Sequence, residues 1–206
     1  MPYTVNCNQG KTQRFKRTVL FPLSSVFLLV LSSFTFASEK AETETLVTHQ
    51  TYRSCSVIAS EMLTTVQLHQ KGIPVDTLRT TLPGLTENGL NRLSLLYKKI
   101  DSQGALAVYS LANSQYSRCA KSVFDRQGKP KPQEPDYLFY FCSGENKIRH
   151  EIILARMVNA PMQDLIRQLP QGRKALAPYI YNIVKEKDLK AAYDFSATEL
   201  KRCLNQ

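Results

Sequence analysis

The sequence lacks the short motifs that mark common catalytic and cofactor-binding sites. It contains no G-x-S-x-G, H-E-x-x-H, P-loop or paired-glycine fingerprint. It also has no C-x-x-C, and its three histidines (His49, His69 and His150) do not have the spacing of metal ligands. We therefore predict no catalytic residue, no cofactor and no metal site.

Histidine next to a carboxylate occurs at one place only, His150-Glu151. Neighbours in a helix point about 100° apart, so these two side chains do not face each other as a catalytic dyad would. A hydrolase of unrecognised type stays open as the alternative function. It requires a cleft in which a histidine or a carboxylate pair converges with other polar groups.

Residues 1–37 have the pattern of a cleaved signal peptide. Three basic residues, Arg14, Lys16 and Arg17, precede an apolar run from Val19 to Phe36, and small residues precede a cut after Ala37. An uncleaved anchor is the alternative, because Thr18 to Ala37 has about the length of a membrane helix. We expect a periplasmic or secreted protein that contacts the membrane only if this segment is retained.

The net charge of the mature chain is smaller than that of the whole sequence. The full chain has 27 basic and 17 acidic residues, and the leader holds four basic residues and no acidic ones. The 169 residues that follow it therefore carry 23 basic and 17 acidic side chains. This moderate and dispersed excess argues against a nucleic-acid partner. Residues 38–50 are acidic and rich in threonine, so we predict a mobile lead-in there.

Four cysteines remain after the leader, Cys55, Cys119, Cys142 and Cys203. An even number in an exported protein indicates two disulfides, for which three pairings exist. We favour Cys55–Cys119 and Cys142–Cys203, because each pair brackets one copy of an apparent repeat.

The repeat appears when Cys55 is aligned with Cys142. The offset is 87 positions up to Pro83 and becomes 84 after one gap of three residues. A self-similar unit of this size indicates a tandem duplication. The matched pairs are Pro74 with Pro161, Leu78 with Leu165, Leu82 with Leu169, Pro83 with Pro170, Tyr97 with Tyr181, Ala107 with Ala191, Tyr109 with Tyr193, Arg118 with Arg202, and Cys119 with Cys203.

Apolar residues within each unit have helical spacing. We expect a first helix over Ser54 to Lys71 that carries Ile58, Met62, Val66 and His69 along one face and is ended by Gly72. A short helix should follow Pro74 and end at Pro83-Gly84. Two further helices are predicted from matched faces. These faces are Leu93, Leu96, Tyr97 and Ile100 with Ala177, Ile180, Tyr181 and Val184, and Ala105, Val108, Tyr109, Ala112 and Tyr116 with Leu189, Ala192, Tyr193, Ser196 and Leu200.

These patterns predict an all-α protein of two tandem, duplicated four-helix units, each of short helices and each closed by a disulfide. Unit 1 covers residues 51–119, a proline-rich linker covers 120–136, and unit 2 covers 137–206; the units are allowed to pack as one domain. The run Tyr137 to Phe141 fits either a strand or a helix start. We expect it to pack the units together, with a partner site as the alternative.

Candidate binding residues are few. Tyr97, Tyr109, Tyr181 and Tyr193 either line a groove or fill core positions with the hydroxyl at the rim. Arg118 and Arg202 either bind an anion or complement the negative end of a helix. Basic residues gather at the end of unit 2, namely Lys185, Lys187, Lys190, Lys201 and Arg202.

The architecture resembles that of small exported helical proteins of Gram-negative bacteria, with no shared motif. We expect a non-enzymatic protein that binds a protein, a peptide or an acidic envelope component, and a structural role in envelope assembly is a further alternative.

Overall fold

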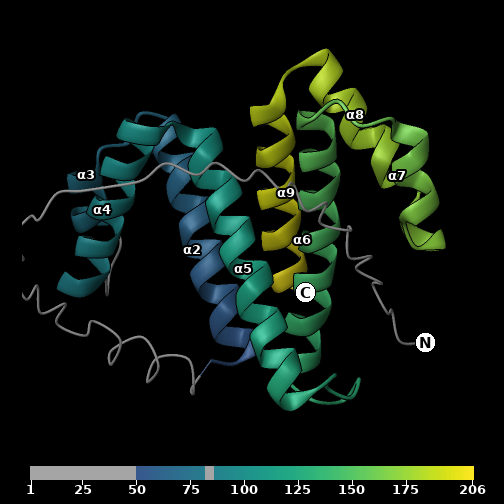
Figure 1. Ribbon diagram of the computed structural model, residues 1–206. Coiled ribbons are helices and arrows are strands. Elements are labelled where there is room, and N and C mark those ends of the chain that lie inside the picture. The colour runs from purple at the N-terminus through teal and green to yellow at the C-terminus, as the bar shows by residue number, and fades with distance from the viewer. Residues whose placement is uncertain (1–49, 82–85) are drawn as a thin grey trace, which may run out of the picture. The chain divides into compact units, whose positions relative to one another are not determined.

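The protein is all-α throughout the part that the computed structural model describes, residues 50–81 and 86–206 (Figure 1). These ranges contain eight α-helices, one short 3-10 turn and no strand. None of the helices there combines the length and the apolar character needed to cross a membrane. The predicted signal peptide, the lead-in up to His49, and the predicted helix stop at Pro83-Gly84 lie outside the described residues.

The first half, residues 50–127, contains helices α2 (Tyr52–Gln70), α3 (Val75–Thr81), α4 (Glu87–Gln103) and α5 (Ala105–Gln127). Thr51 begins α2 with a reciprocal cap: its hydroxyl accepts the Ser54 amide at 3.1 Å, and the Ser54 hydroxyl accepts the Thr51 amide at 2.9 Å. Gly72 follows α2 at a φ of +71°, a conformation that other residues rarely adopt. The predicted stop is therefore confirmed.

The second half, residues 136–206, contains α6 (Asp136–Met157), α7 (Met162–Gln168), the 3-10 turn Gln171–Arg173, α8 (Leu176–Glu186) and α9 (Leu189–Leu204). The run Tyr137 to Phe141 is the first part of α6, so it is a helix. Asn159 follows α6 at a φ of +53°. Asparagine tolerates this left-handed conformation better than most residues do, and the helix ends there.

Three predictions need correction. The helices are not uniformly short, because α2, α4, α5 and α6 have 17 to 23 residues. The connection between the halves is shorter than 120–136, since α5 continues to Gln127. Ile58 was expected on the apolar face of α2 but is 52% exposed. The buried stripe of α2 instead follows Tyr52, Cys55, Ala59, Leu63 and Val66, because this stripe faces the other long helices.

The core forms where α2, α5, α6 and α9 pack against one another (Figure 1). In the first half α4 contacts α2 and α5, and α3 packs on α4; in the second half α8 contacts α6 and α9, and α7 packs on α8. Each half contributes its first and last helix to this core. The two halves thus place corresponding helices in corresponding pairs.

A disulfide joins the first and last helix of each half. Cys55 of α2 is bonded to Cys119 of α5, and Cys142 of α6 is bonded to Cys203 of α9, which confirms the predicted pairing. The two bridges span 64 and 61 residues. Each therefore closes nearly the whole of its half into a loop.

Polar side chains in the core satisfy one another across helices. The Asn146 amide of α6 donates to the Asn113 side-chain oxygen of α5 at 2.7 Å, and the Asn113 amide donates to the Tyr109 carbonyl at 2.8 Å. The Ser196 hydroxyl of α9 donates to the Asn146 oxygen at 3.4 Å. Such a buried network costs little while its members stay paired, so it favours one register of the three helices.

Candidate binding grooves

The tyrosines predicted as groove residues fall into two groups. Tyr109 and Tyr193 are fully buried and stack on each other, with ring centroids 5.4 Å apart and planes 4° from parallel. The Tyr109 hydroxyl donates to the Asp194 carboxylate, and burial, reinforced by this carboxylate, raises the pKa of Tyr109. The pair therefore fills the core between α5 and α9 and lines no groove.

Tyr97 belongs to a smaller buried cluster with Leu78 and Leu93, Tyr181 is partly buried against the main core, and the two make matching hydrogen bonds. The Tyr97 hydroxyl donates to the Ile73 carbonyl at 2.7 Å, and the Tyr181 hydroxyl donates to the Ala160 carbonyl at 2.9 Å. Each bond ties a residue just after the first helix of its half to the third helix. Tyr181 also lines a pocket, described below.

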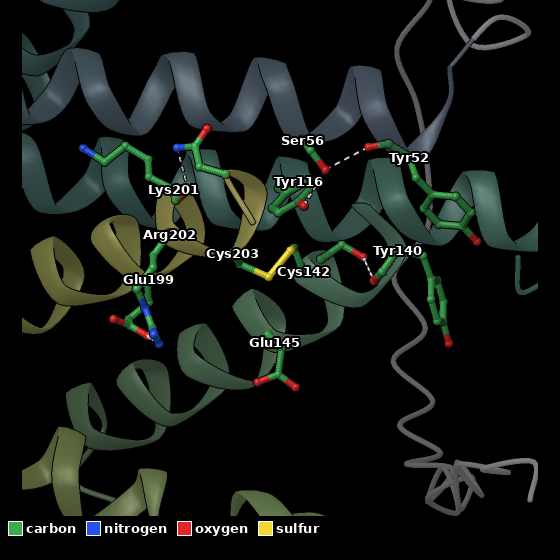
Figure 2. Close-up of a disulfide and its surroundings, with 12 residues drawn as sticks. Tyr52, Ser56, Tyr116, Tyr140, Cys142, Glu145, Glu199, Lys201, Arg202 and Cys203 are labelled. Atoms are coloured by element: carbon green, nitrogen blue, oxygen red, sulfur yellow. Dashed lines mark hydrogen bonds and ion pairs between the residues drawn. A yellow bond between two sulfur atoms is a disulfide. The ribbon is translucent and has the colours of Figure 1, made fainter. Parts of the chain in front are cut away.

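The two candidate arginines have different surroundings. Arg118 is exposed and lines a groove between α2 and α5. Arg202 donates to the Glu199 carboxylate at 2.6 Å, as Figure 2 shows next to the Cys142–Cys203 bridge, and this hydrogen bond raises the pKa of Arg202. Of the predicted pair, Arg118 is thus the arginine that faces a groove.

The α2 groove, named for the helix that forms its floor, has a volume of about 580 Å³. One face of α2 from Arg53 to Leu68 lines it. The fifteen helical rises between these two residues correspond to a length of about 22 Å. Helices α3 and α4 flank its far end, while the start of α6 and the end of α9 flank the end near Arg53. Its apolar lining consists of Val57, Leu68, Leu78, Leu93, Phe139 and Leu204.

Charge in the α2 groove lies along α2 and α4. Arg92 of α4 donates to Glu61 of α2 at 3.3 Å, so the one carboxylate in the groove is paired. Arg53 adds a second cation at the other end. Between them the floor carries the small side chains of Ser60 and Thr64, which leave room for a segment to approach the helix closely. The groove therefore combines apolar walls with a net positive charge.

The aromatic run at the start of α6 packs the two halves together, as predicted, and one of its rings also lines a groove. Tyr140 packs edge-on against Tyr52 of α2, with ring centroids 5.4 Å apart, and so joins the halves (Figure 2). Phe139 lines the α2 groove. Phe141 is 40% exposed. The sequence identified this run as notable but did not show which of its rings point into a groove.

Two further cavities lie over the halves. The α2–α5 groove, about 530 Å³, runs beside the Cys55–Cys119 bridge and includes Ile58, Met62 and Arg118. The α6–α8 pocket, about 680 Å³, is lined by Arg156, Met162, Pro178, Tyr179, Tyr181, Asn182 and Lys185. Neither cavity has a histidine or a carboxylate among its lining residues.

His69 and His150 lie outside all three cavities. The His69 ring nitrogen Nε2 is 2.7 Å from the Asp101 carboxylate, which links α2 to α4 on the surface. This is a histidine–carboxylate pair that the sequence did not reveal, because 32 residues separate its members. His150 is buried, Nε2 has no hydrogen-bond partner, and burial lowers the pKa of the ring. His49 lies outside the described residues.

The residues of the described ranges include no group of three histidine, cysteine, aspartate or glutamate side chains arranged to hold a metal ion. Glu61 is the one acid that lines the three cavities above, and it is paired; a smaller cavity of about 290 Å³ beside Tyr52 is lined by two acids, Glu134 and Asp136, together with Lys129 and Lys131. Comparison of the chain with protein-family models, with curated proteins and with solved structures gave no match.

Proposed function

We propose that this chain is an exported, non-enzymatic binding protein that holds an amphipathic helical segment of a partner protein in the α2 groove. The observation that carries the proposal is the groove itself, an apolar channel along four turns of α2 with Val57 54% exposed at its floor. An apolar side chain in that position loses stabilising burial unless something covers it.

The shape of the α2 groove favours a helix as its occupant. A helix-in-groove complex buries apolar residues at positions i, i+3 or i+4, and i+7 of the incoming helix, over a length of two to four turns. The length of about 22 Å along α2 matches this. The small residues Ser60 and Thr64 lie where a second helix needs close approach.

The charge of the α2 groove favours an acidic flank on the partner. Arg53 and Arg92 outnumber Glu61, and Glu61 is already paired with Arg92. An acidic side chain beside the apolar anchors gains a charge-assisted contact to Arg53. The partner is therefore a helical segment with an apolar stripe and one or more carboxylates at its edge.

Export and duplication belong to the same proposal. Export is supported by two observations. Two structural disulfides are typical of a protein in an oxidising compartment, and residues 1–37 have the pattern of a signal peptide that would direct the chain there. Duplication is supported by the matched helix order, the paired bridges, Gly72 and Asn159 at corresponding turns, and the corresponding bonds of Tyr97 and Tyr181.

The test is capture of a partner by the full chain, expressed with its leader and a C-terminal tag, and isolated from the envelope fraction of a Gram-negative host. Val57→Asp places a charged group where the apolar stripe of the partner should pack and also competes for Arg53 one turn earlier on α2, so it should reduce capture of the partner about tenfold or more. Leu95→Asp is the matched control, because Leu95 is 65% exposed on α4 and does not line the groove.

Support requires a captured protein that Val57→Asp loses and Leu95→Asp keeps. It also requires that a synthetic peptide of its amphipathic segment compete for capture. Equal capture by the two variants would contradict the groove as the site. A tagged chain that stays in the cytoplasm with free thiols would contradict export.

A further inference from the structure

The α6–α8 pocket has two cations and no acid among its lining residues, and the carboxylate of Glu186 at its edge accepts a hydrogen bond from the lining Asn182 at 2.8 Å. Arg156 at the end of α6 and Lys185 in the last turn of α8 both line it, and its other polar lining comes from tyrosines and Asn182. Neither cation forms an ion pair within the described residues. Like charges that share a cavity repel each other, so the pocket is electrostatically incomplete without an anion.

The guanidinium of Arg156 is held in place on one side. Its Nη1 donates to the Asn159 side-chain oxygen at 2.7 Å, and its Cζ lies 5.7 Å from the centroid of the Tyr181 ring. Tyr181 is itself fixed by its bond to the Ala160 carbonyl. A guanidinium positioned in this way loses little freedom on binding, and its remaining N–H groups suit the oxygens of a phosphate.

The corresponding positions of the first half hold a pair of residues that bind each other. With the offsets of the proposed duplication, Arg156 corresponds to His69 and Lys185 to Asp101. In the first half these two side chains bond to each other at 2.7 Å, beside Tyr97, whose ring centroid lies 5.0 Å from that of His69. The second half has lost this internal pair and has two cations and an open pocket of about 680 Å³ in its place.

We propose that the α6–α8 pocket binds the phosphate group of a small molecule or of a lipid headgroup. The two positive charges match a phosphate monoester, with Arg156 contacting two oxygens and Lys185 a third. Tyr179 is 54% exposed at the same pocket and offers a ring to the organic part of the ligand. This site is separate from the α2 groove and does not depend on the function proposed for it.

Phenyl phosphate is the soluble probe, because it joins a phosphate monoester to a ring that Tyr179 can contact. Titration of the 15N-labelled protein should shift the amide signals of residues 156–162 and 178–186 and saturate. Benzoate is the comparison anion and should bind more weakly. Saturable binding at other residues, or equal affinity for benzoate, would overturn the proposal. So would the absence of binding both to phenyl phosphate and to the anionic lipid vesicles described next.

The lipid source is tested in parallel. Vesicles of phosphatidylcholine with phosphatidic acid, whose headgroup is a phosphate monoester, should co-sediment with the protein, and vesicles of phosphatidylcholine alone should not, if the ligand is a headgroup. Binding to phenyl phosphate with no preference for phosphatidic acid assigns a soluble ligand. In either case the response must depend on Arg156 and Lys185.

Four variants separate binding in this pocket from a general effect of the protein's basic surface. Arg156→Gln and Lys185→Gln should each weaken binding about tenfold, the loss expected for one charge-assisted contact. Arg156→His combined with Lys185→Asp installs the pair of the first half, so it should fold and lose binding. Lys187→Gln removes a cation from the end of α8 outside the pocket and should leave the affinity unchanged. An equal loss in Lys187→Gln would also overturn the assignment.

Discussion

The two halves of the molecule share their backbone turns and differ in their cavities. In each half a residue at positive φ follows the first helix, Gly72 in one and Asn159 in the other. A tyrosine hydroxyl then binds the carbonyl of the next residue. A disulfide joins the first and last helix of each half. The side chains that line open space do not correspond in this way. Residues that fix the path of the chain are thus alike in the two halves, while residues that face cavities differ.

The clearest difference within the core is at two adjacent positions. Met62 and Leu63 of α2 correspond to Arg149 and His150 of α6. Arg149 and His150 are 6% and 4% exposed, and Arg149 Nε and Nη1 and His150 Nε2 lack hydrogen-bond partners. Burial lowers the pKa of both groups. The second half therefore buries nitrogen atoms without hydrogen-bond partners at two positions where the first half has apolar side chains.

The largest expected effect tests whether the two disulfides stabilise the protein equally. Removing either bridge, by Cys55→Ala with Cys119→Ala or by Cys142→Ala with Cys203→Ala, should lower the free energy of unfolding by about 4 kcal/mol on the chain-entropy model. The two losses should be nearly equal, because the loops span 64 and 61 residues. Urea unfolding of the oxidised proteins measures both. If removing one bridge lowered the free energy of unfolding by less than 50% of the loss caused by removing the other, the two bridges would not be equivalent.

A smaller effect is expected at His150. His150→Leu copies the residue of the first half and removes a buried nitrogen without a partner, so it should raise the free energy of unfolding by about 1 kcal/mol. Val66→Ala in the core of α2 serves as the opposite control, since it leaves a cavity and should destabilise the protein.

His150 should also make stability depend on pH. Its folded-state pKa lies below the ordinary value of 6.5, because burial disfavours the charged ring. The unfolded chain then binds more protons as the pH falls from about 7 toward 5, so the stability contributed by the neutral ring is lost on acidification. Urea unfolding across this window should show the decline in the parent protein and a shallower one in His150→Leu. An identical decline in both would exclude His150 as its source.

The fold was largely predictable from the sequence, because its determinants are local or covalent. Helical spacing located the segments that became α2, α4, α5, α8 and α9, and Gly72 and Pro74 marked a real boundary. The cysteine count and the repeat together gave the correct disulfide pairing. Ile58 was misplaced because its spacing fits the apolar face of an isolated helix, whereas the packing of four helices selected the neighbouring stripe.

The cavities were not predictable, because they form between segments that are far apart in the chain. The α2 groove joins α2 to Leu93 and to Leu204, and no local pattern signals that these residues meet. The His69–Asp101 pair and the contact of Arg156 with Tyr181 were missed for the same reason. Of the predicted site residues, Tyr181 and Arg118 line cavities, while Tyr109 and Tyr193 form the core.

The halves also differ along the face that forms the α2 groove. Val57, Ser60 and Thr64 of α2 correspond to Gly144, Lys147 and Glu151 of α6, where Lys147 and Glu151 form an exposed ion pair at 2.8 Å. An apolar floor on one helix thus corresponds to a charged, solvated face on the other. A partner helix should therefore recognise the first face and ignore the second.

The most direct measurement is photo-crosslinking from these two corresponding positions. Benzoylphenylalanine is introduced at residue 57 or at residue 144, where a side chain meets open space. The protein is expressed with its leader, the envelope fraction is irradiated, and crosslinked peptides are identified by mass spectrometry. Binding in the α2 groove predicts that residue 57 crosslinks to an amphipathic segment of one partner protein and that residue 144 does not. Equal crosslinking from both positions, or none from residue 57, would contradict it.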